Sequence, residues 1–389
     1  MKFFRKIKAL LKGVVSIFRS KLYIEELTHN AYFDKYYPTY FSNVNLIFSE
    51  EVIEVPNPKS NIDFLPWKFR IYRKRLINKG FVAIFKNAQV FSQKGQIITQ
   101  ENVLITDLSR SFGVPKKKND FGTRKPIVTE KNGKKVAVLT TDGSNTYYHW
   151  LFDILPRIQL LKKAGIFENI DLFILPKLKH DFQKSSLSYF NIPNSKILEI
   201  EDNESVLTDN LIVPSLPSDL GTVNLWALNF IRDTFLLDSS HLNLRRKVYI
   251  SRKNATARRL LNEDEIIEYL IGLDFEIIEA ENLSFIEQVK LFSEAEVVVS
   301  PHGSGLSNIV FCNKKTKVID LFYGDFLVPC FWVIAAQLDL DYYYETSIEL
   351  KQDFSPYWES KGQDDYFPLE KLKGILKTAN IKELSTSLP

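Results

Sequence analysis

Cysteine and methionine are scarce in this chain, which has 2 cysteines and 1 methionine among 389 residues. Two thiols, at Cys312 and Cys330, are too few for a disulfide framework or a cysteine metal cluster. Their apolar neighbours indicate that both are core residues in a protein of a reducing compartment. Histidines, cysteines and carboxylates nowhere recur at metal-ligand spacing, and internal repeats are missing. We therefore expect no metal, no cofactor and no solenoid.

An excess of charge of one sign is also missing. The 51 basic and 47 acidic side chains leave a formal net charge of +4, which is too small and too dispersed to predict a nucleic-acid partner. Hydrophobic residues make up 45% of the chain and aromatic residues 13%. This globular composition and length predict about two domains of roughly 150 to 200 residues each.

Long hydrophobic runs are absent from the N-terminal region. The longest uncharged stretch of this region, Gly13 to Phe18, is far shorter than the roughly 20 residues that span a bilayer. Apolar residues instead recur at helical spacing over residues 1–21, with lysines and arginines between them. We predict a basic amphipathic helix within residues 1–25 that lies on an anionic membrane surface. The alternative is a helix docked on the protein's own body.

Residues 45–109 have a β pattern, with short apolar runs separated by turn signals. The runs are residues 81–85, 88–91, 96–98 and 103–108. They predict an antiparallel meander.

The periodicity then changes to that of a strand, a turn and a helix. An apolar strand over 136–139 is followed by a polar turn over 141–146 and a helix over 147–163. Further buried strands are expected at 171–175 and 211–214, and a helix over 225–237 that bridges two domains. The first domain is thus predicted to be a sheet with helices, preceded by the meander.

The second half alternates strands and helices regularly. We expect strands at 247–251, 275–278, 297–300 and 317–322, with helices over 263–271 and 285–295. Capping boxes are predicted where Asn262 precedes Glu265 and where Ser284 precedes Glu287. This alternation is typical of a parallel, doubly wound sheet.

The strongest chemical signal is the loop from Ser300 to Ser307, where a buried strand leads into Gly-Ser sequence and a helix. Gly303 and Gly305 allow close approach of the backbone to an anion, and His302 and Ser304 add donors. Such loops at the carboxyl ends of parallel strands bind phosphates. The alternative is an ordinary glycine turn.

Arg252 and Lys253 directly follow the strand at 247–251, so they leave the same edge of the predicted sheet. Two cations there would stabilise a diphosphate leaving group, although a cation at a strand end is also a common surface residue. Glu287 is assigned first to its capping box and second to contact with a ribose.

His149, Asp153 and Arg157 form one polar stripe, at i, i+4 and i+8, on the otherwise apolar helix 147–163. A histidine and an aspartate one turn apart can act as a general base and its partner. The alternative is a structural salt-bridge face. Pro156 removes a helix hydrogen bond and predicts a kink.

Two other motifs are set aside. Asp339-Leu340-Asp341 has the D-x-D spacing of metal-dependent sugar transferases, but it lies late, before an aromatic run, and is interpreted as structural. Ser304 lies in Pro-His-Gly-Ser-Gly, which is not the G-x-S-x-G of a hydrolase, and no downstream histidine remains as a base.

Three blocks resemble an inverting glycosyltransferase family that includes plant xylosyltransferases of arabinoxylan and N-glycans, animal O-linked N-acetylglucosamine transferases and bacterial capsule-locus proteins. The blocks span residues 145–157, then 248–253 with 259–265, then 283–288 through 300–308.

The resemblance implies a two-domain GT-B fold, with two Rossmann-like domains facing a cleft. It also implies metal-independent transfer with inversion. The domains would be residues 26–236 on the acceptor side, 237–345 for the nucleotide sugar, and a tail over 346–389 that crosses back to the first domain. Asp153 is predicted as the base, with His149 as its partner or replacement. Asn145 and Arg157 are placed on the acceptor side. Arg252, Lys253, His302, Gly303, Ser304, Gly305 and Glu287 are placed on the donor.

The leading hypothesis is transfer from a UDP-sugar to a glycan or lipid-linked oligosaccharide, in bacterial capsular or surface polysaccharide biosynthesis at the cytoplasmic face of the cell membrane. The rival is a non-catalytic, membrane-associated scaffold that binds nucleotide or glycan. A phosphate-handling enzyme is a third reading, and it would need a metal site that the sequence does not contain.

Overall fold

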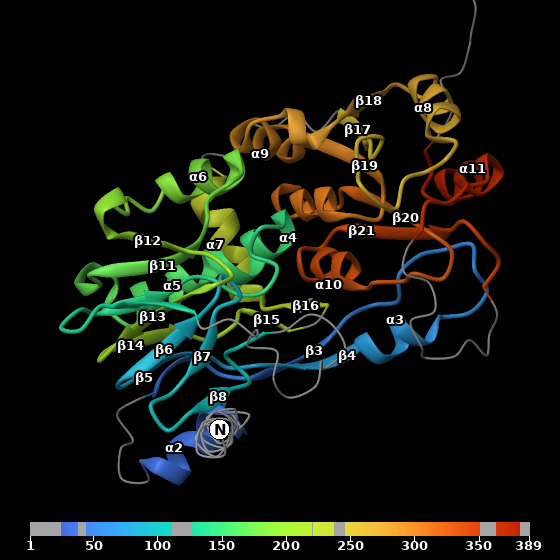
Figure 1. Cartoon of the computed structure of the whole chain (residues 1–389). Coiled ribbons are helices and arrows are strands. Elements are labelled where there is room, and N and C mark those ends of the chain that lie inside the picture. The colour runs from blue at the N-terminus through green and yellow to red at the C-terminus, as the bar shows by residue number, and fades with distance from the viewer. Residues whose placement is uncertain are drawn as a thin grey trace, which may run out of the picture.

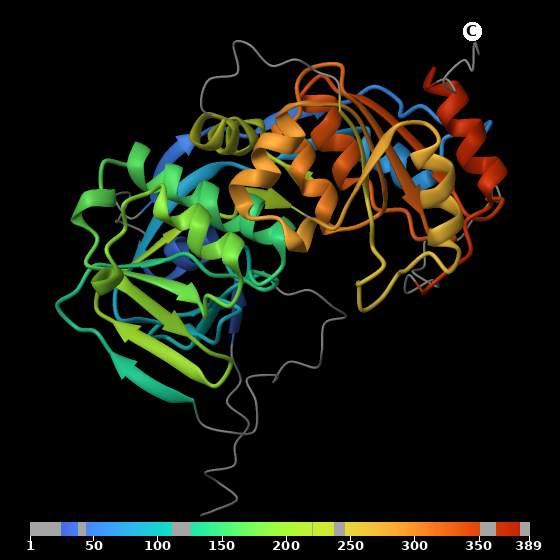
Figure 2. The same ribbon diagram turned by 90° about the horizontal axis from the view of Figure 1, so that it is seen from above.

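The computed structural model describes residues 25–37, 44–110, 126–219, 221–236, 246–350 and 363–381. These residues form a mixed α/β protein in which two units lie side by side (Figures 1 and 2). The segment predicted as a basic amphipathic helix, residues 1–21, lies outside the described residues.

The first unit contains two six-stranded sheets. One is a mixed sheet in the order β1 (Glu25–Leu27), β8 (Val103–Ile105), β7 (Gln96–Ile98), β6 (Ala88–Phe91), β13 (Glu204–Thr208) and β9 (Ile127–Glu130). Strands β6, β7 and β8 pair in antiparallel fashion, so the predicted meander is confirmed for these three strands. Helix α2 (His29–Tyr36) packs against β1 and β8.

The other sheet carries the order β12 (Ile197–Ile200), β11 (Leu172–Pro176), β10 (Val136–Val138), β14 (Leu211–Pro214), β5 (Gly80–Phe85) and β2 (Val44–Phe48). The first four strands are parallel, whereas β5 runs antiparallel to both neighbours. Placing β5 in the meander was wrong. Its residues are buried at five of six positions, which suits a sheet covered on both faces.

The four parallel strands have the order 3-2-1-4 when counted from β10. Their connections therefore reverse direction between β10 and β14. Open α/β sheets bind ligands at such a switch point, beyond the carboxyl ends of the two strands.

The predicted helix 147–163 is interrupted. It consists of α4 (Tyr147–His149), a π-helical turn over Trp150–Ile154, and α5 (Leu155–Lys163). The Leu155 N–H donates to the Trp150 carbonyl, one residue further back than in an α-helix. The wide turn directly precedes Pro156, which has no N–H to continue the ordinary ladder. Helices α6 (Asp181–Ser188) and α7 (Leu225–Phe235) complete this part of the unit.

The second unit is a parallel sheet, as predicted, with the four predicted strands and a fifth strand, β21 (Asp341–Thr346), that was not predicted. Its order is β18 (Phe275–Ile278), β17 (Arg246–Ile250), β19 (Ala295–Pro301), β20 (Lys317–Phe322) and β21. Its helices are α8 (Glu263–Ile271), α9 (Phe285–Ser293), a 3₁₀ helix over Ser304–Phe311, α10 (Cys330–Gln337) and α11 (Leu369–Thr378).

 Counted from β17, the strand order is 2-1-3-4-5, which puts the switch point between β17 and β19.

The two predicted helix caps differ. Ser284 and Glu287 form the reciprocal capping box at the start of α9, as predicted. The box at Asn262 was wrong. Its side-chain oxygen accepts from the Phe367 N–H at 3.0 Å instead of from the start of α8, so Asn262 holds the C-terminal segment against this unit.

A segment of the first half crosses to the second unit. It begins at Val55 and includes α3 (Trp67–Tyr72). In the sequence it connects β3 (Glu51–Glu54) to β4 (Lys74–Ile77), and these two strands pair as a two-stranded sheet. The Lys59 N–H donates to the Tyr342 carbonyl at 3.1 Å, and the Lys59 carbonyl accepts from the Tyr344 N–H at 3.0 Å. In Figure 1 this blue segment lies beside orange and red elements of the second unit.

The C-terminal helix packs on the second unit. Leu372, Ile375 and Leu376 of α11 join a core cluster with residues of β17, β19, β20 and α8. Its contact with the first half is to the crossing segment, where the Thr378 hydroxyl donates to Asn61 at 2.6 Å.

The Asp339-Leu340-Asp341 motif has structural partners. Asp339 pairs with Lys315 at 2.6 Å, and Asp341 pairs with Lys59 of the crossing segment at 2.9 Å. Both carboxylates thus fasten β21 to neighbouring segments, in agreement with the structural interpretation.

We expect Phe69→Ala to destabilise the protein by about 3 to 5 kcal/mol, because the ring is wholly buried and the substitution leaves a cavity. Its centroid lies 5.1 Å from that of Trp332 and 4.6 Å from that of Tyr344. Urea unfolding measures the change. Ile71→Ala, on the exposed side of the same helix, is the control and should change stability by less than about 0.5 kcal/mol. Equal effects would mean that Phe69 does not anchor α3.

Candidate active site

A buried carboxylate, Asp153, organises the first switch point. Its side chain has no solvent exposure. Arg110 Nη1 lies 2.5 Å from Asp153 Oδ2, His149 Nδ1 lies 2.6 Å from the same oxygen, and the Ser218 hydroxyl donates to Oδ1. These groups come from the end of the meander, the start of the interrupted helix and the segment after β14. Both carboxylate oxygens therefore have partners of matching chemistry.

Burial alone would raise the pKa of Asp153. The charge of Arg110 and the hydrogen bonds from His149 and Ser218 outweigh it and lower the pKa to about 2. The carboxylate is ionised at neutral pH, so Nδ1 of His149 carries the proton of this hydrogen bond. The side chain of His149 is 21% exposed, in contrast to that of Asp153. The pair thus has an inner anion and an outer imidazole with a fixed orientation.

Arg157 does not join the exposed part of this site. Its side chain is fully buried, and its guanidinium donates to the Pro214 carbonyl at 2.6 and 3.0 Å and to the Thr140 carbonyl at 3.0 Å. These carbonyls lie at the carboxyl ends of β14 and β10, where the strands diverge and lose ladder partners. Burial lowers the pKa of Arg157 to about 9. Its role in the structure is to join the two strand ends.

A second cluster surrounds Gly303 at the switch point of the second unit. A Cβ atom on Gly303 would lie 2.0 Å from Arg252 Nη1, so the guanidinium rests directly against this glycine. Arg252 also donates to the carbonyls of Arg258 and Ala257, at 3.3 and 3.0 Å. Only a residue without a side chain leaves room for this contact.

Arg258 adds a second guanidinium to this cluster. Its backbone is left-handed, with φ of 57°, and the guanidinium lies 5.1 Å from the Phe326 ring centroid. Burial, and then the nearby positive charge of Arg252, lower the pKa of Arg258. Two cations that repel each other beside a glycine-containing loop form a site suited to an anion.

His302 lies deeper than predicted for a direct phosphate ligand. Its side chain is 6% exposed, and Nδ1 is 2.9 Å from Asp320 Oδ2. The Tyr342 hydroxyl donates to the same oxygen at 2.8 Å, and the imidazole stacks on Phe322 with centroids 4.7 Å apart. The Asp320 carboxylate and these rings therefore fix the imidazole at the base of the loop.

Several other predicted donor residues lie apart from the arginines. Lys253 is exposed and pairs with Asp264 at 2.7 Å. Glu287 is exposed and engaged in the α9 cap, where hydrogen bonds from Ser284 lower its pKa. Ser304 and Gly305 directly follow Gly303 and begin the 3₁₀ helix, where Gly305 lies against Ile250.

Asn145, predicted on the acceptor side, lies in the turn that follows β10. Its amide donates to Gln93 at 2.9 Å, and its side-chain oxygen accepts from Gln183 at 3.3 Å. It therefore ties this turn to the meander and to α6.

The two clusters meet across the junction of the units. The Tyr147 hydroxyl donates to Asn308 at 2.6 Å, and the Asn308 amide donates to the Gly305 carbonyl at 3.1 Å. The ring of Tyr148 lies 5.2 Å from that of His149 and 5.8 Å from that of Phe331, which in turn lies 5.1 Å from His302. The helix bearing the histidine–aspartate pair thus docks on the glycine loop.

Sequence comparison covers this same pair of clusters. Residues 147–319 match the family model Glycosyltransferase 61. The matched region begins at the helix that bears His149 and ends in β20, so it contains Asp153, Arg252 and the Gly303 loop.

A relative of part of the chain is named as a glycosyltransferase. The beta-1,2-xylosyltransferase RCN11 of Oryza sativa subsp. japonica is 27% identical over 142 residues, covering 32% of this chain. The similar region spans about a quarter of the relative, or 27% of its length. Together the family match and this relative support glycosyl transfer by the chain.

Three residues of the site were not singled out in the sequence. Arg110 and Ser218 lie 43 and 65 residues from Asp153, so no local spacing connects them. Ser218 lies just beyond the carboxyl end of an apolar strand, and this position is the signal that could have found it. Arg258 lies six residues after Arg252, but its left-handed backbone is not visible in a sequence.

Within the described ranges, none of the helices has the length and apolarity needed to traverse a lipid bilayer. Within the same ranges, no three histidine, cysteine or acidic side chains are grouped closely enough to hold a metal ion.

We expect the stability of the protein to depend on the ionisation of Asp153. Its folded pKa of about 2 is below the ordinary value of 3.8, so its contribution is present above about pH 4 and is lost as the pH falls toward 2. Between about pH 5 and pH 2 the wild type should therefore lose about 2 kcal/mol more stability than Asp153→Asn. Urea unfolding at several pH values measures this difference. Parallel losses would show that the buried carboxyl does not ionise.

Proposed function

We propose that this protein is an inverting glycosyltransferase that moves a sugar from a UDP-sugar to a glycan acceptor. The observation that carries the proposal is the docking of the helix that bears His149 and Asp153 on the glycine loop, against which Arg252 rests. One cluster is suited to deprotonate a hydroxyl and the other to receive a diphosphate, and the family match implies a nucleotide-sugar donor and a glycan acceptor.

The donor diphosphate is assigned to the switch point of the second unit. Arg252 and Arg258 provide positive charge, and the loop after β19 provides backbone N–H groups. As the bond from the anomeric carbon to the phosphate oxygen breaks, negative charge grows on the diphosphate. Positive groups fixed in advance stabilise that charge without reorganising. We propose that the arginines meet this need and that transfer requires no metal ion.

We assign His149 as the general base and Asp153 as its positioning residue. Asp153 is fully buried, accepts hydrogen bonds at both oxygens and has a pKa of about 2, which makes it a weak base. His149 is partly exposed, and Asp153 stabilises the imidazolium that forms on proton uptake. The acceptor hydroxyl gives its proton to His149 while its oxygen attacks the anomeric carbon from the face opposite the leaving diphosphate. The configuration at that carbon is inverted.

The fold proposed for this reaction is GT-B. Each unit has a parallel sheet with a switch point, and the two candidate clusters lie at these two positions. We further propose a lipid-linked or surface glycan acceptor, in bacterial capsular or surface polysaccharide synthesis at the cytoplasmic face of the membrane. The basic amphipathic pattern of residues 1–21 supports contact with anionic lipid.

We expect UDP or a UDP-sugar to stabilise the protein with a chelator present, because the arginines supply the positive charge. A ligand at about 100 times its Kd adds roughly 2.7 kcal/mol. Thermal unfolding of the wild type and of Arg252→Ala measures the effect, which the variant should lose. Arg259→Ala is the control, because it removes the same charge from a residue that pairs with Asp364 at the surface.

A stabilisation that needs a divalent cation would overturn the metal-free proposal. If no nucleotide stabilises the wild type, the donor site is wrong. Nucleotide binding without turnover of any UDP-sugar would favour the scaffold protein over the enzyme.

Gly303→Ala should weaken nucleotide binding by displacing the Arg252 guanidinium from its position against the loop. Isothermal titration with UDP measures this loss. Gly374→Ala, a glycine-to-alanine change in the remote helix α11, is the control and should bind UDP as the wild type does. Equal affinity of all three proteins would mean that the Arg252–Gly303 contact has no role in binding.

His149→Gln should lower the transfer rate about 10²- to 10⁴-fold, the usual contribution of a general base. The melting shift with UDP should stay unchanged, because His149 is not assigned to the donor. Donor turnover in the presence of acceptor measures the rate. A variant with wild-type activity would remove His149 from the mechanism.

A further inference from the structure

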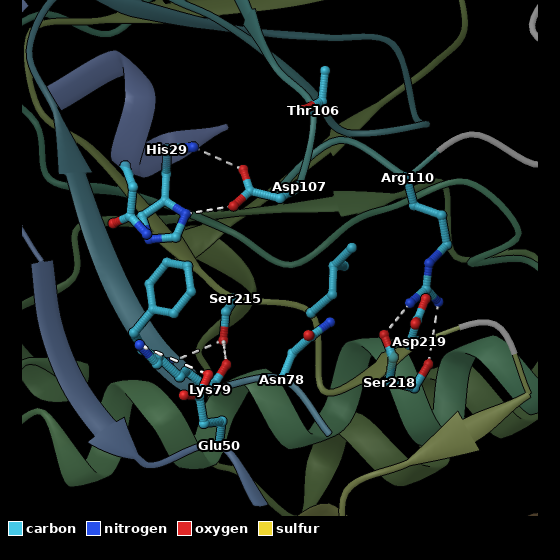
Figure 3. A pocket seen from close by; sticks show the side chains of 13 residues that line it. His29, Glu50, Asn78, Lys79, Thr106, Asp107, Arg110, Ser215, Ser218 and Asp219 are labelled. Atoms are coloured by element: carbon cyan, nitrogen blue, oxygen red, sulfur yellow. Dashed lines mark hydrogen bonds and ion pairs between the residues drawn. The ribbon is translucent and has the colours of Figure 1, made fainter. Parts of the chain in front are cut away.

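A polar pocket of about 460 Å³ adjoins the Asp153 cluster in the first unit. Figure 3 shows its walls, which come from segments far apart in the sequence. His29 begins α2, Asp107 follows β8, Asn78 lies between β4 and β5, and Ser215 and Ser218 follow β14. The pocket is thus at the carboxyl end of β14, beside the switch point of the first sheet, where α/β sheets place ligands.

The walls of this pocket are held in fixed positions. Asp107 accepts from the backbone N–H of His29 at 2.9 Å and also hydrogen-bonds the imidazole. That imidazole stacks on Phe81, with centroids 4.2 Å apart and an interplanar angle of 27°. The Ser215 hydroxyl accepts from the Phe81 N–H at 3.0 Å. A pocket held in this way is formed before a ligand arrives, which lowers the entropy cost of binding.

The charges of the lining indicate the chemistry of its ligand. Three carboxylates, Glu50, Asp107 and Asp219, line the pocket together with two permanent cations, Arg110 and Lys79. Arg110 is paired with Asp153, so the lining has no surplus of positive charge to attract a phosphate. The carboxylates, hydroxyls and the amides of Asn30 and Asn78 instead offer many acceptors and donors. This set matches the hydroxyl groups of an uncharged sugar.

Arg110 connects the pocket to the proposed base. Its guanidinium lines the pocket, lies 3.2 Å from the Ser218 hydroxyl and contacts Asp153, which orients His149. A sugar in the pocket is therefore separated from the histidine–aspartate pair by the Arg110 side chain and Ser218.

We infer that this pocket binds an uncharged sugar residue of the glycan acceptor, next to the residue that receives the transferred sugar. The inference rests on the proposed function for the identity of the acceptor. The first unit would thus bind the neutral part of the acceptor. The phosphate of a lipid-linked acceptor would bind outside this pocket.

Cysteine labelling tests binding without relying on activity. Both native cysteines are buried, so Asn78→Cys introduces an accessible thiol at the exposed Asn78 position in the pocket wall. N-ethylmaleimide labels it, and the rate is followed by mass spectrometry with methyl β-xyloside, methyl β-galactoside, methyl β-glucoside or cellobiose present. A glycoside at about four times its Kd should slow labelling about fivefold. Inorganic phosphate at the same concentration should not.

Asn132→Cys, exposed beyond β9 and outside the pocket, is the matched control whose labelling no sugar should slow. The labelled Asn78→Cys protein should lose transfer to acceptor but keep the full melting shift with UDP. If no neutral sugar protects Asn78→Cys while UDP still stabilises the protein, the inference fails and the donor site stands. Protection by phosphate alone also overturns it. If sugars protect but no nucleotide binds, the pocket is a sugar site and the proposed transferase function fails.

Discussion

The buried negative charge of Asp153 is the constraint on which the first unit depends. A carboxylate that is removed from water without partners costs several kcal/mol, so its three partners must all be in place when the protein is folded. Arg110 comes from the end of the meander, Ser218 from the segment after β14 and His149 from the interrupted helix. Satisfying one anion therefore brings two sheets and a helix into a fixed relation, and the same anion orients the imidazole assigned as the base.

The second unit meets the opposite requirement. Two guanidinium groups lie close together beside Gly303, and their mutual repulsion is relieved when an anion arrives. The structure therefore joins a buried carboxylate that has its partners in the protein to a cluster of two neighbouring guanidinium groups. The junction between them combines the aromatic contacts of Tyr148 and Phe331 with the hydrogen bond from Tyr147 to Asn308.

Local periodicity predicted most of the parallel architecture, because hydrophobic runs and helix caps depend on neighbouring residues. Four of the five strands of the second sheet and the position of Arg252 beside the Gly303 loop follow from it. Partners from distant segments could not be predicted in this way. β5 pairs with β14 and β2 and not with the meander, because its buried side chains suit a sheet that is covered on both faces. Arg110 contacts Asp153 across 43 residues of sequence.

Some local signals had more than one physical use. A cation after a strand turned inward at Arg252 but outward at Lys253, where Asp264 was available as a partner. Asn262 was used to bind Phe367 instead of closing a helix cap. Residue type and spacing restrict such side chains to a few partners, and tertiary packing selects among them.

The crossing segment from Val55 to Tyr72 limits how the two units move. Its Lys59 backbone pairs with β21, and Phe69 is enclosed by rings of the second unit. A large rotation of the units would have to break these hydrogen bonds and expose that aromatic cluster to water. We therefore infer that any ligand at the junction enters and leaves through small displacements of loops, while the sheets keep their relative positions.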